Sequence, residues 1–246
     1  MPCPHANRQA ADSAVNPDFE AFIREQDFPC VGAKAALVRG ALETDTLGDL
    51  RTNTDDFALW LGLSEFAKNL KPGAMVVQSF AVIFPDTPEL TEMQFERALW
   101  ERLQGLHYVD TQMGQRWADT TSDDPSTNNF SLSIAGQSFF VIGLHPGASR
   151  PARRFEHAAL VFNSNAQFEA LREDGRYYQM QKIIRERDKA LAGAINPMLN
   201  DFGNGSEAAQ YSGRLVGEDW RCPFSARKPV ELSIDPGLQR IAEAAE

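Results

Sequence analysis

The sequence predicts an α+β fold, a single domain in which a mixed or antiparallel sheet is flanked by helices. Helix-like and strand-like segments follow one another along the 246 residues without the regular alternation of a doubly wound sheet. Two strand-like runs, residues 130–134 and 138–144, meet at a hairpin turn over residues 135–137. Hydrophobic residues make up 43% of the chain, which is enough apolar material for one core, and no internal repeat divides it.

The first half of the chain alternates between helical and strand-like patterns. Residues 16–26 are expected to form a short amphipathic helix with Phe19 and Phe22 on one face, ended by a turn at residues 28–30. Residues 30–39 fit a strand and the start of a helix equally well. The other elements expected in this half are a helix over 54–69, a strand over 75–84 that Pro85 ends, and a helix over 91–106 that begins at Thr91.

The second half combines short strands with two helices. After residue 196 the chain is rich in loops as far as residue 224. The predicted domain spans residues 16–230, between a disordered lead of residues 1–15 and a C-terminal tail of residues 231–246. The expected elements are, in order, a polar loop over 119–129, the hairpin, a strand over 159–162, and helices over 165–173 and 177–191.

Charge and composition argue against several classes of protein. The formal net charge of −10 opposes binding to nucleic acid or to an anionic membrane. No segment reaches the roughly 20 apolar residues of a membrane helix, and the N-terminus lacks the basic and apolar regions of a signal peptide. Three cysteines at long spacings imply no disulfide framework. We therefore expect a cytoplasmic protein that binds neither nucleic acid nor membrane, of unknown oligomeric state.

A histidine and a cluster of arginines follow the second strand of the hairpin. His145 stands where this apolar strand meets a Pro-Gly turn, and a neutral imidazole is a good ligand for iron or zinc. The alternative is a histidine that is hydrogen-bonded within a loop. Arg150, Arg153 and Arg154 come next, and guanidinium groups hold carboxylates or phosphates. In an acidic chain this cluster suits an anionic cofactor or substrate, or else a surface with internal ion pairs.

Two further places could carry chemistry. Cys30 follows a proline, and a thiolate binds soft metals and haem iron, although a buried cysteine is equally a small hydrophobic residue. The run of residues 196–214 is rich in glycine, asparagine and serine and is long enough to be a functional loop. It carries Glu207, Tyr211 and Arg214, although Glu207 could simply begin a helix.

Several long motifs, in the same order along the chain, resemble the YqcI/YcgG family from about Asp27 to Phe224. They are FPCVGAKAAL, FERALWERLQGLH, FFVIGLHPGASRPARRF, LVFNSNAQFEALRE, IRERDKALAGAINPML, and SEAAQYSGR followed by WRCPF. Characterised members, such as the N-hydroxylase of guanitoxin biosynthesis, look like haem-dependent oxygenases that hydroxylate a nitrogen of a small amine or guanidine-bearing molecule. The resemblance therefore implies haem b, dioxygen and an external electron donor.

The resemblance also suggests roles for individual residues. His145 of the LHP motif is the first candidate for the axial haem ligand and Cys30 is the second. The arginine cluster would meet the haem propionates, and Arg214 joins this cofactor-binding set. The charges of Asp188 and Glu207 suit a cationic amine or guanidinium substrate. The expected catalytic set is Glu207, Tyr211 and Asp188.

One position departs from the family pattern. The family commonly has a histidine in FN-x-H-x-QF where this chain has Asn165; if that histidine serves as ligand or proton donor in relatives, the chemistry here is altered or lost. Two other functions stay open. The protein could be a haem carrier or sensor that turns over no amine, or a cofactor-free protein that binds a small anion. A Soret band would separate the haem-binding functions from the last one.

Overall fold

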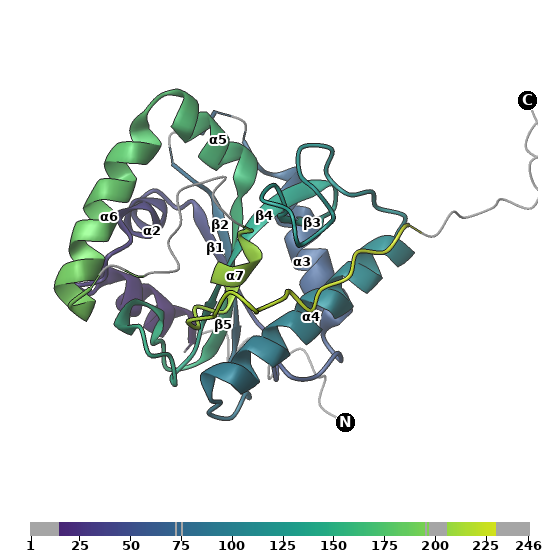
Figure 1. Ribbon diagram of the computed structural model, residues 1–246, viewed down its shortest axis with the longest axis horizontal. Helices are drawn as coiled ribbons and strands as arrows, with labels where there is room; N and C mark the ends of the chain where they lie inside the picture. The colour runs from purple at the N-terminus through teal and green to yellow at the C-terminus, as the bar shows by residue number, and fades with distance from the viewer. Residues whose placement is uncertain (1–14, 72, 75, 195, 197–205, 230–246) are drawn as a thin grey trace, which may run out of the picture.

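The computed structural model describes residues 15–71, 73–74, 76–194, 196 and 206–229. Within these residues, five strands form one sheet in the order β1-β2-β5-β4-β3, with helices on both of its faces (Figure 1). The predicted α+β class, with a mixed sheet flanked by helices, is therefore confirmed. The predicted C-terminal tail, and all of the predicted lead except Val15, lie outside the described residues.

The sheet is mixed because β1 runs parallel to β2, whereas the other neighbouring strands pair in antiparallel fashion. A parallel pair needs a crossover connection, and α3 (Asp56–Lys68) supplies it between these two strands. The strands are β1 Leu42–Thr46, β2 Ser79–Phe84, β3 Leu132–Ile134, β4 Gln137–Leu144 and β5 Ala158–Ser164.

The two faces of the sheet bury different helices, since successive side chains of a strand point to opposite sides. On one face, residues such as Val82 pack in a core with α3 and α4 (Glu92–Gln112). On the other face, residues such as Ile83 pack with the helix of residues 15–24 and α2 (Val31–Val38). β2 is buried along its whole length, as its unbroken apolar sequence SFAVIF indicates.

Most of the helices and strands expected from the sequence are present in the structure, although some of their bounds differ. Residues 30–39, which fitted two structures, form α2, and the helix predicted over 91–106 continues to Gln112. β1 is a strand that the sequence does not predict, because LETDT is polar and lies at the edge of the sheet. The other helices are η1 Pro151–Arg153, α5 Asn165–Glu173, α6 Arg176–Ala192 and α7 Ala208–Tyr211.

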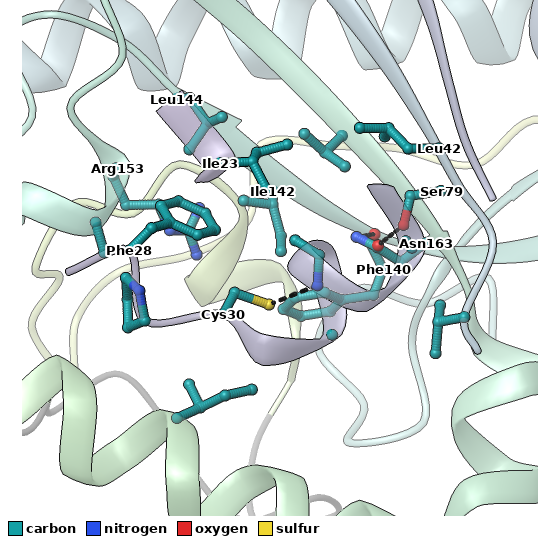
Figure 2. A pocket seen from close by; sticks show the side chains of 18 of the residues that line it. Ile23, Phe28, Cys30, Leu42, Ser79, Phe140, Ile142, Leu144, Arg153 and Asn163 are labelled. Carbon is teal, nitrogen blue, oxygen red and sulfur yellow. Dashed lines mark hydrogen bonds between the residues drawn. The ribbon is translucent and has the colours of Figure 1, made fainter. Parts of the chain in front are cut away.

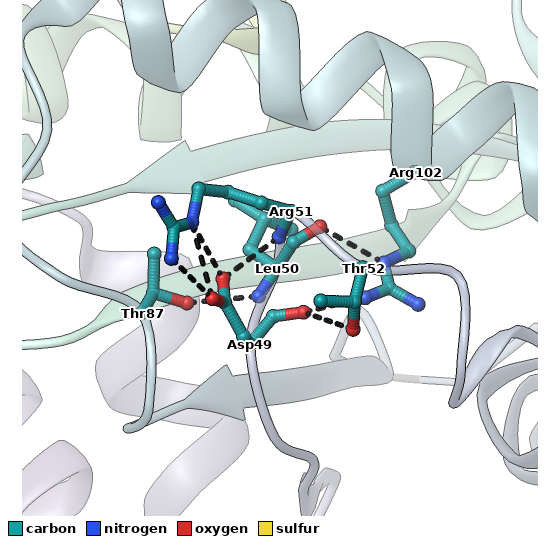
Figure 3. Close-up of polar contacts among 6 residues, drawn as sticks. All are labelled: Asp49, Leu50, Arg51, Thr52, Thr87 and Arg102. Atoms are coloured by element: carbon teal, nitrogen blue, oxygen red, sulfur yellow. Dashed lines mark hydrogen bonds and ion pairs between the residues drawn. The ribbon is translucent and has the colours of Figure 1, made fainter.

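A buried charge fixes the loop between β1 and α3 against α4. The Arg102 side chain is fully buried, and its Nη1 lies 2.6 Å from Asp56 Oδ1. Its guanidinium also donates hydrogen bonds to the backbone carbonyls of Asp49 (2.7 Å) and Leu50 (3.2 Å) (Figure 3). Asp49 itself accepts hydrogen bonds from Arg51. Because the N–H groups of Arg102 donate to acceptors inside the protein, this network stabilises the fold.

Candidate functional site

A largely apolar pocket of about 250 Å³ lies on the sheet face that carries α2. β4 and β5 form its floor, the helix of residues 15–24 and α2 form one wall, and α6 forms another (Figure 2). Met180 and Ile184 of α6 are half-buried, so the pocket reaches the surface of the protein there. The polar side chains that line the pocket are Cys30, Ser79, Arg150, Arg153, Asn163, Asp188 and Asn196.

Cys30 is held in this pocket as the N-cap residue of α2. Pro29 precedes it, and its Sγ accepts the backbone N–H of Ala33 at 3.4 Å (Figure 2). A Cβ at Gly32 would lie 3.2 Å from Met180 Sδ and 3.8 Å from Cys30 Sγ, so glycine keeps the space beside the sulfur open. Burial raises the pKa of the Cys30 thiol, although backbone N–H groups and the charge of Arg153 act against this. The sulfur is therefore a thiol at neutral pH.

Arg153 brings a positive charge to the same pocket. It belongs to η1, and its guanidinium donates to the backbone carbonyls of Gly143 (2.9 Å), Tyr211 (3.3 Å) and Gln210 (3.2 Å). Among the described residues, no carboxylate lies within ion-pair distance of it. Removal from water lowers the pKa of Arg153 to about 10, against the opposing charge of Asp188, so the group stays charged at neutral pH.

Arg150 and Asp188 form an ion pair at the edge of the pocket. Arg150 also donates to the carbonyl of Ala194 at 2.9 Å, and Asp188 accepts the N–H of Asn196 at 3.1 Å. These contacts tie the segment around η1 to α6. Both predicted residues thus reach the pocket, where the two charges neutralise each other.

His145 lies on the other side of the sheet. A Cβ at Gly143 would meet Phe95 of α4, and His145, two residues later, points the same way. The imidazole stacks on the Phe95 ring with centroids 4.2 Å apart, and only 2% of the residue is exposed. Burial lowers the pKa of His145 to about 4. The sequence places this histidine at a strand end, but it does not reveal which face the side chain takes, and the structure puts it outside the pocket.

Three other predicted residues lie away from the pocket and make internal contacts. Arg154 is exposed and donates to the carbonyls of Ala148 and Ser149. Arg214 forms an ion pair with Glu96 of α4. Tyr211 is buried, and its hydroxyl donates to the carbonyl of Phe139 at 3.1 Å and accepts the N–H of Leu132 at 3.2 Å. Burial raises the pKa of Tyr211. These contacts hold α7 and the segment after it against the sheet and α4.

Glu207, the remaining predicted residue, lies in a separate cavity of about 230 Å³ with Ser131 and Asn165. The Ser131 hydroxyl lies 3.2 Å from Glu207 Oε2. Burial raises the pKa of Glu207 to about 7. The predicted catalytic set is therefore not assembled in one place, since Asp188, Tyr211 and Glu207 occupy three different surroundings.

Ser79 and Asn163 also line the pocket, although the sequence analysis does not predict them as site residues. Ser79 Oγ donates to Asn163 Oδ1 at 2.7 Å, across the β2–β5 pairing (Figure 2). The sequence does carry a signal: each is a polar residue at a buried position next to an apolar run, and buried polar groups at such positions need a partner. The pair is a hydrogen-bonding feature of an otherwise apolar floor.

Two further features concern the described part of the chain as a whole. Nowhere in that part do three or more His, Cys, Asp or Glu side chains gather as they would around a metal ion. None of its helices is both long and apolar enough to cross a membrane.

In a comparison with protein families, the model of the YqcI/YcgG family matches residues 19–225. Comparisons with curated proteins and with solved structures give no match. The matched range includes the whole sheet, α2 to α7 and every residue described above for the two cavities.

Proposed function

Because the chain belongs to the YqcI/YcgG family, we propose that it is a haem-dependent oxygenase that hydroxylates a nitrogen of a small amine or guanidine-bearing substrate. The observation that carries this proposal is the Cys30 thiol, a soft ligand that lines an apolar pocket beside the charged guanidinium of Arg153. We propose haem b as the cofactor, with dioxygen and an external electron donor as co-reactants.

The donor set of the pocket fits haem b. The porphyrin supplies four equatorial ligands, so a single protein ligand is enough. Cys30 and Met180 both bring sulfur to the pocket, and of these two Cys30 is the one that can become a thiolate. Apolar walls suit the porphyrin face, and Arg153 suits a propionate. The pocket of about 250 Å³ opens to the surface beside the half-buried α6 side chains Met180 and Ile184, which would move outward to admit a whole porphyrin.

Each side chain has a defined part in this proposal. Bound haem would supply the activation of dioxygen. Cys30 would bind the iron as a thiolate after losing its proton, and Arg153 would orient the porphyrin through one propionate. Asn163 Oδ1 already accepts from Ser79 and has a second lone pair, with which it would accept an N–H of the substrate. Phe28 and the other apolar lining side chains would exclude water from the reacting nitrogen.

Two measurements test this function in turn. An absorbance scan of protein expressed with adequate haem supply should show a Soret band. Turnover of a small amine or guanidine with dioxygen and an electron donor should then give a hydroxylated nitrogen, detected by mass spectrometry. A Soret band without turnover of any amine offered would support a haem carrier or sensor instead.

A second candidate function, cofactor-free binding of a small anion, follows from Arg153. Its guanidinium has no carboxylate within ion-pair distance among the described residues and lies in a pocket that a small carboxylate could enter. The absence of any Soret band, together with tight binding of a small carboxylate that Arg153→Ala abolishes, would favour this function over haem chemistry.

A further inference from the structure

The second cavity, which contains Glu207, lies outside the Cys30 pocket and is lined by different residues. It is formed by the loop before β3, the start of β4, the first turns of α5 and the residue that precedes α7. It encloses about 230 Å³. The polar side chains that line it include those of Thr121, Ser131, Asn165, Glu169 and Glu207.

The hydrogen bonds that reach the Glu207 carboxylate come from two neutral side chains, Ser131 and Asn165. Ser131 Oγ lies 3.2 Å from Glu207 Oε2 and 3.0 Å from the carbonyl oxygen of Phe139. A hydroxyl has one hydrogen, so Ser131 cannot donate to both acceptors at once. The ionised carboxylate therefore competes with a backbone carbonyl for one proton. A charged donor from outside the protein would satisfy both.

Two more acceptors at this cavity have no partner among the described residues. Asn165 is 8% exposed; its Nδ2 donates to Ser131 Oγ, whereas its Oδ1 accepts no hydrogen bond. Thr121 Oγ1 is buried and likewise has no partner. Buried polar groups are normally satisfied, so an unsatisfied amide oxygen and hydroxyl beside a buried carboxyl indicate a missing donor.

We propose that this cavity binds a small primary ammonium ion, R–NH3⁺, which donates its N–H groups to Glu207, to Asn165 Oδ1 and to Thr121 Oγ1. A primary ammonium has three donors, matching three acceptors from three different segments. The negative charge of Glu207 balances its positive charge, and the cavity leaves room for a short alkyl group. The site is separate from the haem proposal, because its ligand needs neither Cys30 nor iron.

Neighbouring charges and the state of Glu207 set the pH dependence of this binding. Two charged residues of α5 act on the Glu207 carboxyl. Arg172 lowers its pKa, whereas Glu169 raises it. Burial outweighs both and raises the pKa of Glu207 to about 7. The ammonium itself stays protonated at neutral pH. Its affinity should therefore rise roughly tenfold between about pH 6 and pH 8, as Glu207 ionises.

The test is isothermal titration calorimetry of the full chain at constant ionic strength, with ethylammonium chloride as the probe. Tetramethylammonium carries the same charge but no N–H donor, so it should bind at least tenfold more weakly. Glu207→Gln should abolish binding, and Asn165→Leu should weaken it at least tenfold. Glu173→Gln removes an exposed carboxylate of α5 that does not line the cavity, and it should change the affinity less than twofold.

Several results would overturn the proposal. Tetramethylammonium, potassium or calcium ions binding as tightly as ethylammonium would show a site for charge or metal instead of N–H donors. No ethylammonium binding at about pH 8, or unchanged binding in a folded Glu207→Gln protein, would exclude the site. Circular dichroism verifies that each variant is folded, and Glu207→Gln should be, since glutamine resembles the protonated carboxyl.

Discussion

The imidazole of His145 stacks on the ring of Phe95, with 4.2 Å between the ring centroids and 16° between their planes. This contact lies on the α4 side of the sheet, whereas the Cys30 pocket lies on the other side. The sequence ranks His145 above Cys30 as the axial ligand, whereas the haem function proposed above uses Cys30, the one of the two that lines the pocket. His145 instead belongs to the packing between β4 and α4.

The His145 contact predicts a loss of stability in acid. Its folded-state pKa of about 4 lies below its ordinary value of 6.5, so the unfolded chain binds the proton more tightly. The contribution of neutral His145 to the free energy of unfolding is therefore fully present above pH 6.5. It falls by about 3 kcal/mol as the pH drops to 4. Relative to His145→Gln, the parent should lose this amount in urea unfolding followed by fluorescence. Parallel pH profiles for the two proteins would contradict the account.

Glu207 predicts the opposite pH dependence in an overlapping range. Its folded-state pKa of about 7 lies above its ordinary value of 4.5, so the folded chain holds the proton more tightly. The contribution of protonated Glu207 to the free energy of unfolding is fully present below pH 4.5. It declines by about 3 kcal/mol as the pH rises to 7. Glu207→Gln should therefore gain stability on the parent between these pH values, measured by the same unfolding experiment. A constant difference between the two proteins would show that Glu207 titrates normally.

Arg102 predicts a large structural effect far from both cavities. Arg102→Met should destabilise the fold by about 3–5 kcal/mol, because it leaves the Asp56 carboxylate buried without its partner. The double variant Arg102→Met, Asp56→Leu should recover much of this loss, since it removes both charges. Denaturant midpoints of the three proteins measure the effect. If the double variant is no more stable than the single one, the backbone contacts to Asp49 and Leu50 dominate.

The sequence predicts the fold better than it predicts the site. The α+β class, the hairpin and the bounds of α5 and α6 follow from apolar periodicity and turn residues, which are local signals. β1 is not predicted, because a polar edge strand such as LETDT carries little of the apolar pattern. Residues 30–39 stay ambiguous because the capping of α2 by Cys30 depends on three-dimensional geometry.

Long-range placement explains why only part of the site is predicted. Cys30, Arg150, Arg153 and Asp188 are singled out by residue type, and the structure brings these four to one pocket. His145 is expected beside them because it is close in sequence, yet alternation along β4 sends it to the other face. Whether an arginine meets a cofactor or a backbone carbonyl depends on contacts between distant segments, which one sequence does not specify.

Arg153 and Arg154 are adjacent arginines that the structure separates by role. Arg153→Ala should raise the dissociation constant for haemin about ten- to a hundredfold, because it removes a charge-assisted partner for a propionate. Arg154→Ala is the matched control and should bind haemin as the parent does, since Arg154 is exposed outside the pocket. Haemin titration followed at the Soret band measures both. Equal affinities for the two variants would assign Arg153 to structure alone.

The most direct test of the account is the Soret band of the ferrous–CO complex after reconstitution with haemin. Serine keeps the N-cap of α2 but does not supply a thiolate, so Cys30→Ser isolates the ligand. Cys222→Ser removes another free thiol, one that does not line the pocket, and serves as the control. We predict the longer-wavelength band of thiolate-ligated haem in the parent and in Cys222→Ser, and its loss in Cys30→Ser. A shorter-wavelength, histidine-type band that persists in Cys30→Ser and disappears in His145→Gln would contradict the account.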